Sequence, residues 1–179
     1  MAMQQENEVS KSVARFQEVM GTVDEITHVV LKGHLLVEET LTNTIALHMF
    51  HPEHFHDARL SFDKKISLGR AFCLRKNRLG EWDMLIALNE LRNVLAHNLD
   101  SPRQQAKIDR LRALALQEAA QFPEVGQYLK ANGDKEMIIY ACGHILGFLQ
   151  SFEEDAKQLR TILHAMDRQM NPDQPEFVV

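Results

Sequence analysis

Apolar residues recur every three or four positions along most of this chain, which is the spacing of one face of an α-helix. No window alternates apolar and polar residues in the way that a half-exposed β-strand does. The pattern therefore predicts an all-α protein. Six segments carry the helical spacing, at about residues 9–20, 22–50, 62–74, 81–98, 103–121 and 135–170.

Glycine, proline and small polar residues separate these segments. Pro52 is expected to end the second segment, and the chain from there to Ser61 is expected to be a loop. The dipeptide at 122–123 and the turn at 131–134 are expected to separate the last two helices. Short connections favour antiparallel neighbours, so we expect an antiparallel bundle of five to six helices over residues 1–170 and a flexible tail at 171–179.

Composition and charge narrow the class of protein. With 179 residues, 45% of them hydrophobic, the chain fits one globular domain, and a net charge of −5 leaves room only for a local nucleic-acid site. The acidic, polar N-terminus does not look like a signal peptide. Ile138–Leu149 is too short to span a bilayer and contains His144, so it predicts a buried helix. Cys73 and Cys142 look like packed thiols of a cytoplasmic protein, and no membrane partner is expected.

The stretch ELRNVLAHNL, residues 90–99, places polar side chains late in a helix that otherwise reads as core. Glu90, Asn93 and His97 share one ridge of that helix because they are three and four residues apart. Arg92 lies about 140° around the axis from His97. The guanidinium and the imidazole therefore meet only if Arg92 bends round or if a second copy of the chain supplies one of them.

These residue types suit cleavage of RNA by its own 2′-hydroxyl. That reaction needs a base for the 2′ proton, an acid for the leaving 5′ oxygen and positive charge beside the phosphorane. Histidine is the residue type whose ordinary pKa lies close to neutrality, so His97 suits the role of base or acid, Arg92 offers fixed donors to phosphate oxygens, and Asn93 can orient either partner. The reaction needs no metal or other cofactor, and we expect none.

The spacing of Arg92, Asn93 and His97 resembles the signature of the HEPN superfamily, the higher eukaryote and prokaryote nucleotide-binding domains. GHLLVEETL at 33–41 and FDKKISLGRAF at 62–72 look like the branch grouped with the mannitol operon repressor. This resemblance covers roughly residues 25–100 and implies a helical bundle acting as a homodimer, in a superfamily with many metal-independent ribonucleases. Leu99 stands where many toxin-type members have Tyr, which weakens the analogy to toxins held by an antitoxin partner.

Other interpretations of the same residues stay open. In the simplest structural interpretation, these residues have no catalytic role. Arg92 then pairs with a nearby acid such as Glu90, and Asn93 is a surface amide. His97 is placed where the negative end of the helix dipole stabilises it. Three functions follow from the alternatives: a ribonuclease, a non-enzymatic transcriptional regulator that binds a protein or nucleic acid through the same cleft, and a nucleotide-binding module that uses Arg92 as its phosphate anchor.

A basic segment precedes this helix. Between Asp57 and Gly80 there are seven basic residues and two acids, a local excess that predicts either a track for the RNA backbone or a solvated helix face. If the two elements are antiparallel neighbours, the track leads toward His97. The candidate RNA-binding residues are Lys64, Lys65, Arg70, Arg75, Lys76 and Arg78.

Two smaller features complete the sequence. Four histidines, His48, His51, His54 and His56, fall within nine residues and form a weak candidate for zinc or nickel binding, with a solvated cluster as the alternative. Glu38 and Glu39 lie among apolar residues and are placed to approach the Arg92 site from the side, and Trp82 is expected to anchor the packing of its helix.

Overall fold

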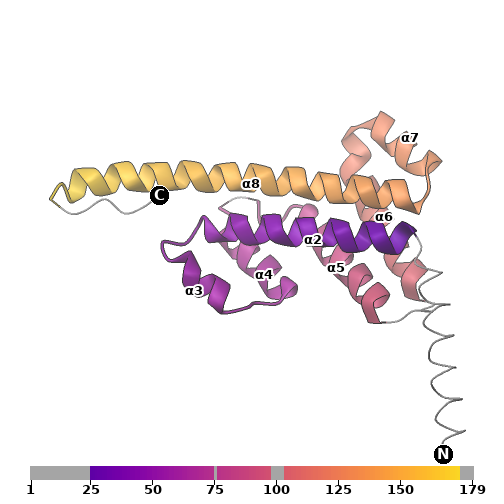
Figure 1. Cartoon of the computed structure of the whole chain (residues 1–179). Helices are drawn as coiled ribbons and strands as arrows, with labels where there is room; N and C mark the ends of the chain where they lie inside the picture. Colours follow the sequence, from indigo (N-terminus) through magenta and orange to yellow (C-terminus); the bar gives the residue numbers. More distant parts are fainter. Residues whose placement is uncertain (1–24, 75, 98–102, 174–179) are drawn as a thin grey trace, which may run out of the picture.

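The computed structural model describes residues 25–74, 76–97 and 103–173, and within these ranges it contains helices and no strand. The all-α prediction is confirmed. The predicted helix at 9–20 lies outside the described residues. The α-helices are α2 (Glu25–Ala46), α3 (Pro52–Asp57), α4 (Phe62–Phe72), α5 (Glu81–His97), α6 (Arg103–Glu118), α7 (Pro123–Ala131) and α8 (Asp134–Met170), and a short 3-10 helix covers Ala119–Gln121 (Figure 1).

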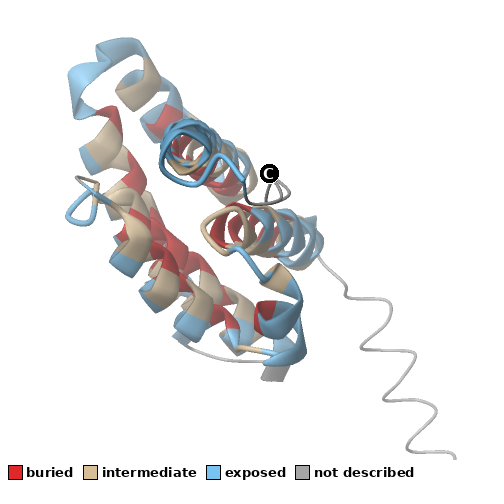
Figure 2. Cartoon of the chain, turned by 90° about the vertical axis from the view of Figure 1, so that its left-hand side faces the viewer, coloured by how far each residue is buried: buried red, intermediate tan, exposed pale blue. Residues whose placement is uncertain are grey.

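One hydrophobic core joins the long helices, and their buried faces point toward one another (Figure 2). Trp82, at the start of α5, is fully buried and meets Phe148 and Phe152 of α8 edge-on, with ring centroids 5.1 and 6.0 Å apart. Its indole N–H donates to the Lys76 carbonyl at 2.9 Å, so the polar atom of the ring is satisfied. The predicted role of Trp82 as a packing anchor is confirmed.

The helices are not uniformly antiparallel, which corrects the predicted bundle. α2 and α8 lie side by side and run in the same direction (Figure 1). Lys135 binds Glu25 near the start of both helices, and Arg160 reaches the Leu47 carbonyl just past the end of α2. Short connections force neighbouring helices to reverse, but more than eighty residues separate α2 from α8 along the chain, so their relative direction is set by packing.

α2 ends at Ala46, earlier than the predicted end near Phe50. The amides of His48 and Met49 bond three residues back, which tightens the chain into a turn. Arg160 donates to the carbonyls of Leu47 at 3.1 Å and Met49 at 2.9 Å, satisfying acceptors that the lost helical turn would have used. The end of α2 is therefore fixed by α8 and not by Pro52.

Two short helices replace predicted connections. α3 occupies Pro52–Asp57 and α7 occupies Pro123–Ala131, and each begins with the proline that was expected to interrupt helical structure. Proline is well suited to the first turn of a helix, because its missing N–H has no partner there in any case. The expected loop from Pro52 to Ser61 is therefore wrong over α3, whereas the breaks expected at 122–123 and 131–134 are confirmed and only the short helix between them, α7, was missed.

α8 extends well beyond the end of α2 (Figure 1). Its first half contains the predicted buried segment Ile138–Leu149, in which Ile138, Ile145 and Leu149 are fully buried, so that prediction is confirmed. In the described part of the chain, we find no helix with the length and apolar character needed to cross a bilayer. The helix ends at Met170 as expected, and residues 174–179 of the predicted tail lie outside the described residues.

Candidate functional site

The last two turns of α5 carry the residues that the sequence singled out. Arg92 is half-buried and its Nη1 donates to Asn93 Oδ1 at 3.1 Å, while Asn93 itself is exposed. His97 is the final residue of α5, and its side chain lies outside the described part of the structure. The fold thus brings Arg92 and Asn93 together, with the backbone of His97 one helical turn further along.

A buried histidine lies beside Arg92. His34 of α2 is only 5% exposed, although it lies in an apolar stripe with Val30, Val37 and Leu41. Its Nε2 lies 3.2 Å from Asn89 Oδ1, one turn before Arg92 on α5. Because Oδ1 can only accept, the ring donates from Nε2 to Asn89. Sequence analysis missed this contact, and its one signal was a polar residue in a core position of α2.

The environment of His34 favours the neutral ring. Burial is the main cause of a lowered His34 pKa, and the positive charges of Arg92 and Lys65 lower it further. The hydrogen bond to Asn89 and the Glu38 carboxylate, whose Oε2 lies 3.8 Å from His34 Nδ1, act in the opposite direction. An uncharged imidazole therefore lies beside the Arg92 guanidinium at neutral pH.

Glu38 connects this group to α4. Its Oε1 accepts from Lys65 Nζ at 2.8 Å, and both side chains are largely shielded from solvent. Glu38 therefore lies in the group around His34, whereas Glu39 is exposed. We call His34, Glu38, Lys65, Asn89 and Arg92 the polar cluster, because together they join α2, α4 and α5.

Glu90 faces a different helix. It accepts hydrogen bonds from Lys107, at 2.8 Å, and from Arg110, both on α6. Burial opposes ionisation of Glu90, but these two hydrogen bonds and the charges behind them hold its pKa below the usual range. In the described residues Glu90 pairs with α6, and Arg92 instead contacts Asn93 and influences His34.

The basic segment runs away from Arg92. α4 and α5 are in contact and antiparallel, since His34 meets both Phe62 at the start of α4 and Asn89 late in α5, while Gly69 packs against Trp82. Lys64 and Lys65 therefore lie toward the Arg92 end of α5, and Arg70, Lys76 and Arg78 lie toward its start.

Several of these basic side chains are bound within the chain. Lys65 pairs with Glu38, Arg70 donates to the Asn77 carbonyl at 2.9 and 3.2 Å, and Lys76 binds Ser151 and Asp155 of α8. Lys64 and Arg78 are exposed, and Arg75 is outside the described residues. The basic surface that remains accessible for RNA near Arg92 is therefore short, and Lys64 is its exposed residue.

The four clustered histidines do not converge in the described structure. His48 packs inward, with its ring 5.0 Å from Phe72 and 4.9 Å from Phe152, and its Nδ1 lies 3.0 Å from the Thr44 carbonyl oxygen. His51 and His54 are exposed beside Glu53. The early end of α2 separates His48 from the others, because the chain turns there before α3 begins.

A cavity of about 420 Å³ lies between α4 and α8, at the far end of α4 from Arg92. Its walls include His48, Phe72, Cys73, Lys76 and Asp155. Burial raises the pKa of the Cys73 thiol to about 11, so this sulfur is protonated at neutral pH and is a poor nucleophile.

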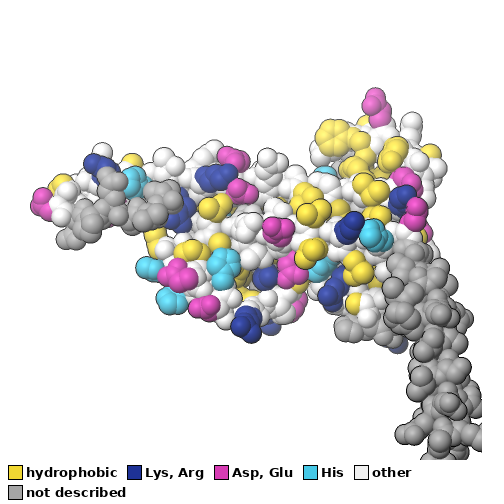
Figure 3. Space-filling model, viewed as in Figure 1, with side chains coloured by type: hydrophobic (Ala, Val, Ile, Leu, Met, Phe, Trp, Pro, Cys, Tyr) yellow, Lys and Arg dark blue, Asp and Glu magenta, His cyan; other side chains and the backbone are white. Residues whose placement is uncertain are grey.

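Apolar side chains are exposed next to the polar cluster. Leu31 and Leu35 of α2 are 41% and 66% exposed. Leu31, Leu35 and Glu38 lie on the same flank of α2. This flank is next to the one that carries His34. The exposed face over α2 shows hydrophobic atoms among charged ones (Figure 3). This flank of α2 therefore carries exposed apolar side chains next to Glu38 of the polar cluster.

No family model, no curated protein and no solved structure matches this chain.

Proposed function

We propose that this protein is a metal-independent endoribonuclease of the HEPN type that works as a homodimer. The observation that carries the proposal is the hydrogen-bonded pair of Arg92 and Asn93 near the end of α5, one turn before His97. A fixed cation and an amide at a helix end next to a titratable residue are the groups that transesterification of RNA requires.

In this mechanism His97 exchanges protons with RNA. As base, an imidazole takes the proton of the 2′-hydroxyl, and the 2′ oxygen attacks the adjacent phosphorus. A second imidazole, as acid, gives a proton to the departing 5′ oxygen. The products are a 2′,3′-cyclic phosphate and a free 5′-hydroxyl. Arg92 stabilises the charge on the phosphorane oxygens, and Asn93 holds the Arg92 guanidinium in position.

A second copy of the chain would overcome the separation of Arg92 and His97 around the axis of α5. Arg92 and His97 point about 140° apart on a straight helix, so one α5 does not present both to one phosphate. A twofold axis beside α5 would bring two arginines and two histidines to one cleft. The exposed Leu31 and Leu35 support an interface on this side, because they lie beside the polar cluster.

A cleavage assay in EDTA tests the proposal. Purified protein is incubated with mixed RNAs, beside His97→Ala, Arg92→Ala and the control His56→Ala, which alters an exposed histidine on α3. We expect cleavage by the unchanged protein and the control, and a loss in both site variants. Equal cleavage by all four proteins, or cleavage by none, would remove the catalytic role.

The internal pairing of Lys65, Arg70 and Lys76 favours a second candidate, a non-enzymatic regulator that binds a protein partner through the same end of α5. With most of the basic segment bound within the chain, the surface offers less to a nucleic-acid backbone. Binding to a transcription-associated protein that survives His97→Ala, together with absent cleavage, would select this candidate.

A further inference from the structure

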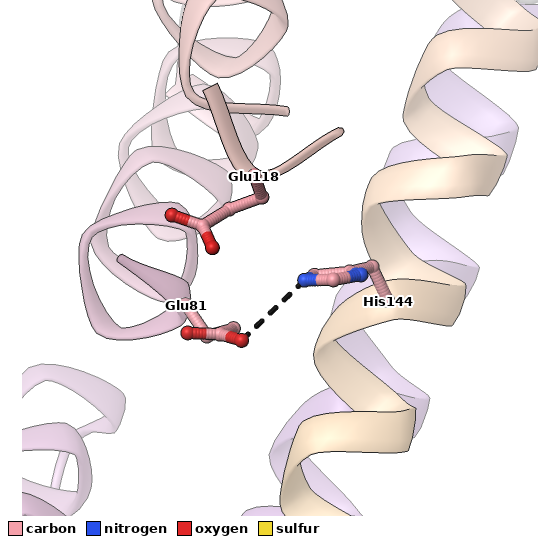
Figure 4. A group of neighbouring side chains, drawn as sticks. All are labelled: Glu81, Glu118 and His144. Atoms are coloured by element: carbon pink, nitrogen blue, oxygen red, sulfur yellow. Dashed lines mark ion pairs between the residues drawn. The ribbon is translucent and has the colours of Figure 1, made fainter. Parts of the chain in front are cut away.

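Three metal-ligand side chains from three different helices meet at the start of α5. Glu81 begins α5, Glu118 ends α6, and His144 lies in the first half of α8. One donor atom from each side chain lies within 4.8 Å of the other two, and His144 Nε2 is 3.5 Å from Glu81 Oε1. All three side chains point into the same space (Figure 4).

Two polar atoms in this group lack hydrogen-bond partners. Glu81 Oε2 and His144 Nε2 are inaccessible to solvent, and neither makes a hydrogen bond. A buried polar atom without a partner costs roughly 1–3 kcal/mol, so native structures usually supply one. His144 Nε2 has only its 3.5 Å ion-pair contact with Glu81 Oε1, and Glu81 Oε2 has no hydrogen bond, so the space between these ligand-type residues suits a bound group that contacts both.

The third ligand is held close by the backbone. A Cβ on Gly80 would lie 1.9 Å from Glu118 Oε1, so only glycine lets this carboxylate sit against the start of α5. Burial and the neighbouring Glu81 charge raise the pKa of Glu118. Two carboxylates that close repel one another, and a bound cation relieves that repulsion.

We propose that Glu81, Glu118 and His144 bind a divalent transition-metal ion, with Zn²⁺ the favoured occupant. Imidazole nitrogen with carboxylate oxygen is a donor set for Zn²⁺ and its neighbours in the first transition row, whereas Mg²⁺ and Ca²⁺ prefer oxygen alone. Ligands of one Zn²⁺ lie about 3–4 Å apart, so small side-chain rotations bring these three atoms to it. With three protein ligands, a tetrahedral ion has one coordination position left for water, which the partial exposure of the three side chains allows to enter.

The bound ion links α5, α6 and α8 at one point. It lies about 16 Å along α5 from Arg92, eleven residues away on the helix. The proposed ribonuclease reaction needs no metal, so the two sites are separable by experiment. Chelation is expected to release the ion and leave RNA cleavage unchanged.

The test is a calorimetric titration of the EDTA-stripped, full-length protein with Zn²⁺. It uses the background His51→Ala/His54→Ala/His56→Ala, which removes the cluster of exposed histidines in and beside α3 that would compete for Zn²⁺. We expect one equivalent to bind in this background. His144→Gln and Glu118→Gln, which remove ligands, are each expected to weaken binding by about 100-fold or more.

Gly80→Ala is the sharpest variant, because it keeps all three ligands. The new methyl group displaces the Glu118 carboxylate, which lies at the end of a flexible side chain, and the backbone at Gly80 has no positive φ that would strain alanine. We expect about tenfold weaker binding with an unchanged circular dichroism spectrum. Binding that disappears in the His51→Ala/His54→Ala/His56→Ala background, that is unaffected by these variants, or that is absent altogether would overturn the proposal.

Discussion

The two ends of α5 present opposite chemistry on one helix. At its start, Glu81 joins Glu118 and His144 in a group rich in carboxylate. Near its end, Arg92 lies beside a neutral His34 and close to Lys65. The helix dipole favours this arrangement, since acids are stabilised at an N-terminus and cations at a C-terminus. The side-chain charge therefore differs between the two ends, with carboxylates at the first and a guanidinium near the second.

The two ends also differ in whether their polar atoms have hydrogen-bond partners. At the start of α5, buried polar atoms lack partners, so something must enter to satisfy them. At the other end, His34 already donates to Asn89, and Arg92 already contacts Asn93. The comparison teaches that a group with unsatisfied ligand atoms and a group whose polar atoms are already paired require different tests, metal affinity for the first and catalysis for the second.

Loss of catalysis is the largest expected effect. Replacing His97 with Ala is expected to slow RNA cleavage by about 10²–10⁴-fold, and Arg92→Ala by about 10²–10³-fold. Initial rates on a defined RNA in EDTA measure both. Glu118→Gln, at the other end of α5, is the matched control and is expected to cleave normally. A rate that falls equally in all three variants would mean that the two ends of α5 are not independent.

The next effect is stabilisation by zinc. At a free Zn²⁺ concentration 100 times the dissociation constant, the free energy of unfolding is expected to rise by about 2.7 kcal/mol. Urea unfolding with and without Zn²⁺ measures this gain. Arg92→Ala should retain it, and His144→Gln should lose it. If Arg92→Ala also loses this stabilisation, the ion binds near the end of α5 and not at Glu81, Glu118 and His144.

A smaller effect concerns the pH dependence of stability at His34. Because burial lowers its pKa in the folded protein below the ordinary value of 6.5, the unfolded chain takes up the proton first. The stabilising contribution of neutral His34 is therefore complete above pH 6.5 and is lost as the pH falls below that value. Unfolding measured from about pH 7 to about pH 5 should show a weaker pH dependence for His34→Gln than for the exposed control His56→Gln.

The smallest effect is expected at Glu90. Its ion pairs with Lys107 and Arg110 are partly exposed, so Glu90→Gln should lower the free energy of unfolding by at most about 1 kcal/mol, and by less in high salt. Since the pKa of Glu90 is lowered, its contribution is present above the usual value of 4.5 and is lost as the pH falls further. A large loss that persists in strong salt would indicate a packing role instead.

The sequence by itself determined the helical class and the cores of the long helices. Helical periodicity is a local property, so the spacing of apolar residues located α5 and α8 closely, and Trp82 and Ile138–Leu149 were correctly assigned to the interior. The pairing of Arg92 with Asn93 was also accessible, because the two residues are adjacent in sequence. Short helices begun by proline were missed, since α3 and α7 carry too few turns to show a period.

Only the tertiary structure decided which distant residues meet. His34 and Asn89 are 55 positions apart, and the ligands Glu81, Glu118 and His144 come from three helices with no common spacing. The parallel course of α2 and α8 likewise depends on how faces pack after the described chain has passed through five other α-helices, α3 to α7. Side-chain packing across long sequence separations is a property of the whole fold, and no local pattern of residues encodes it.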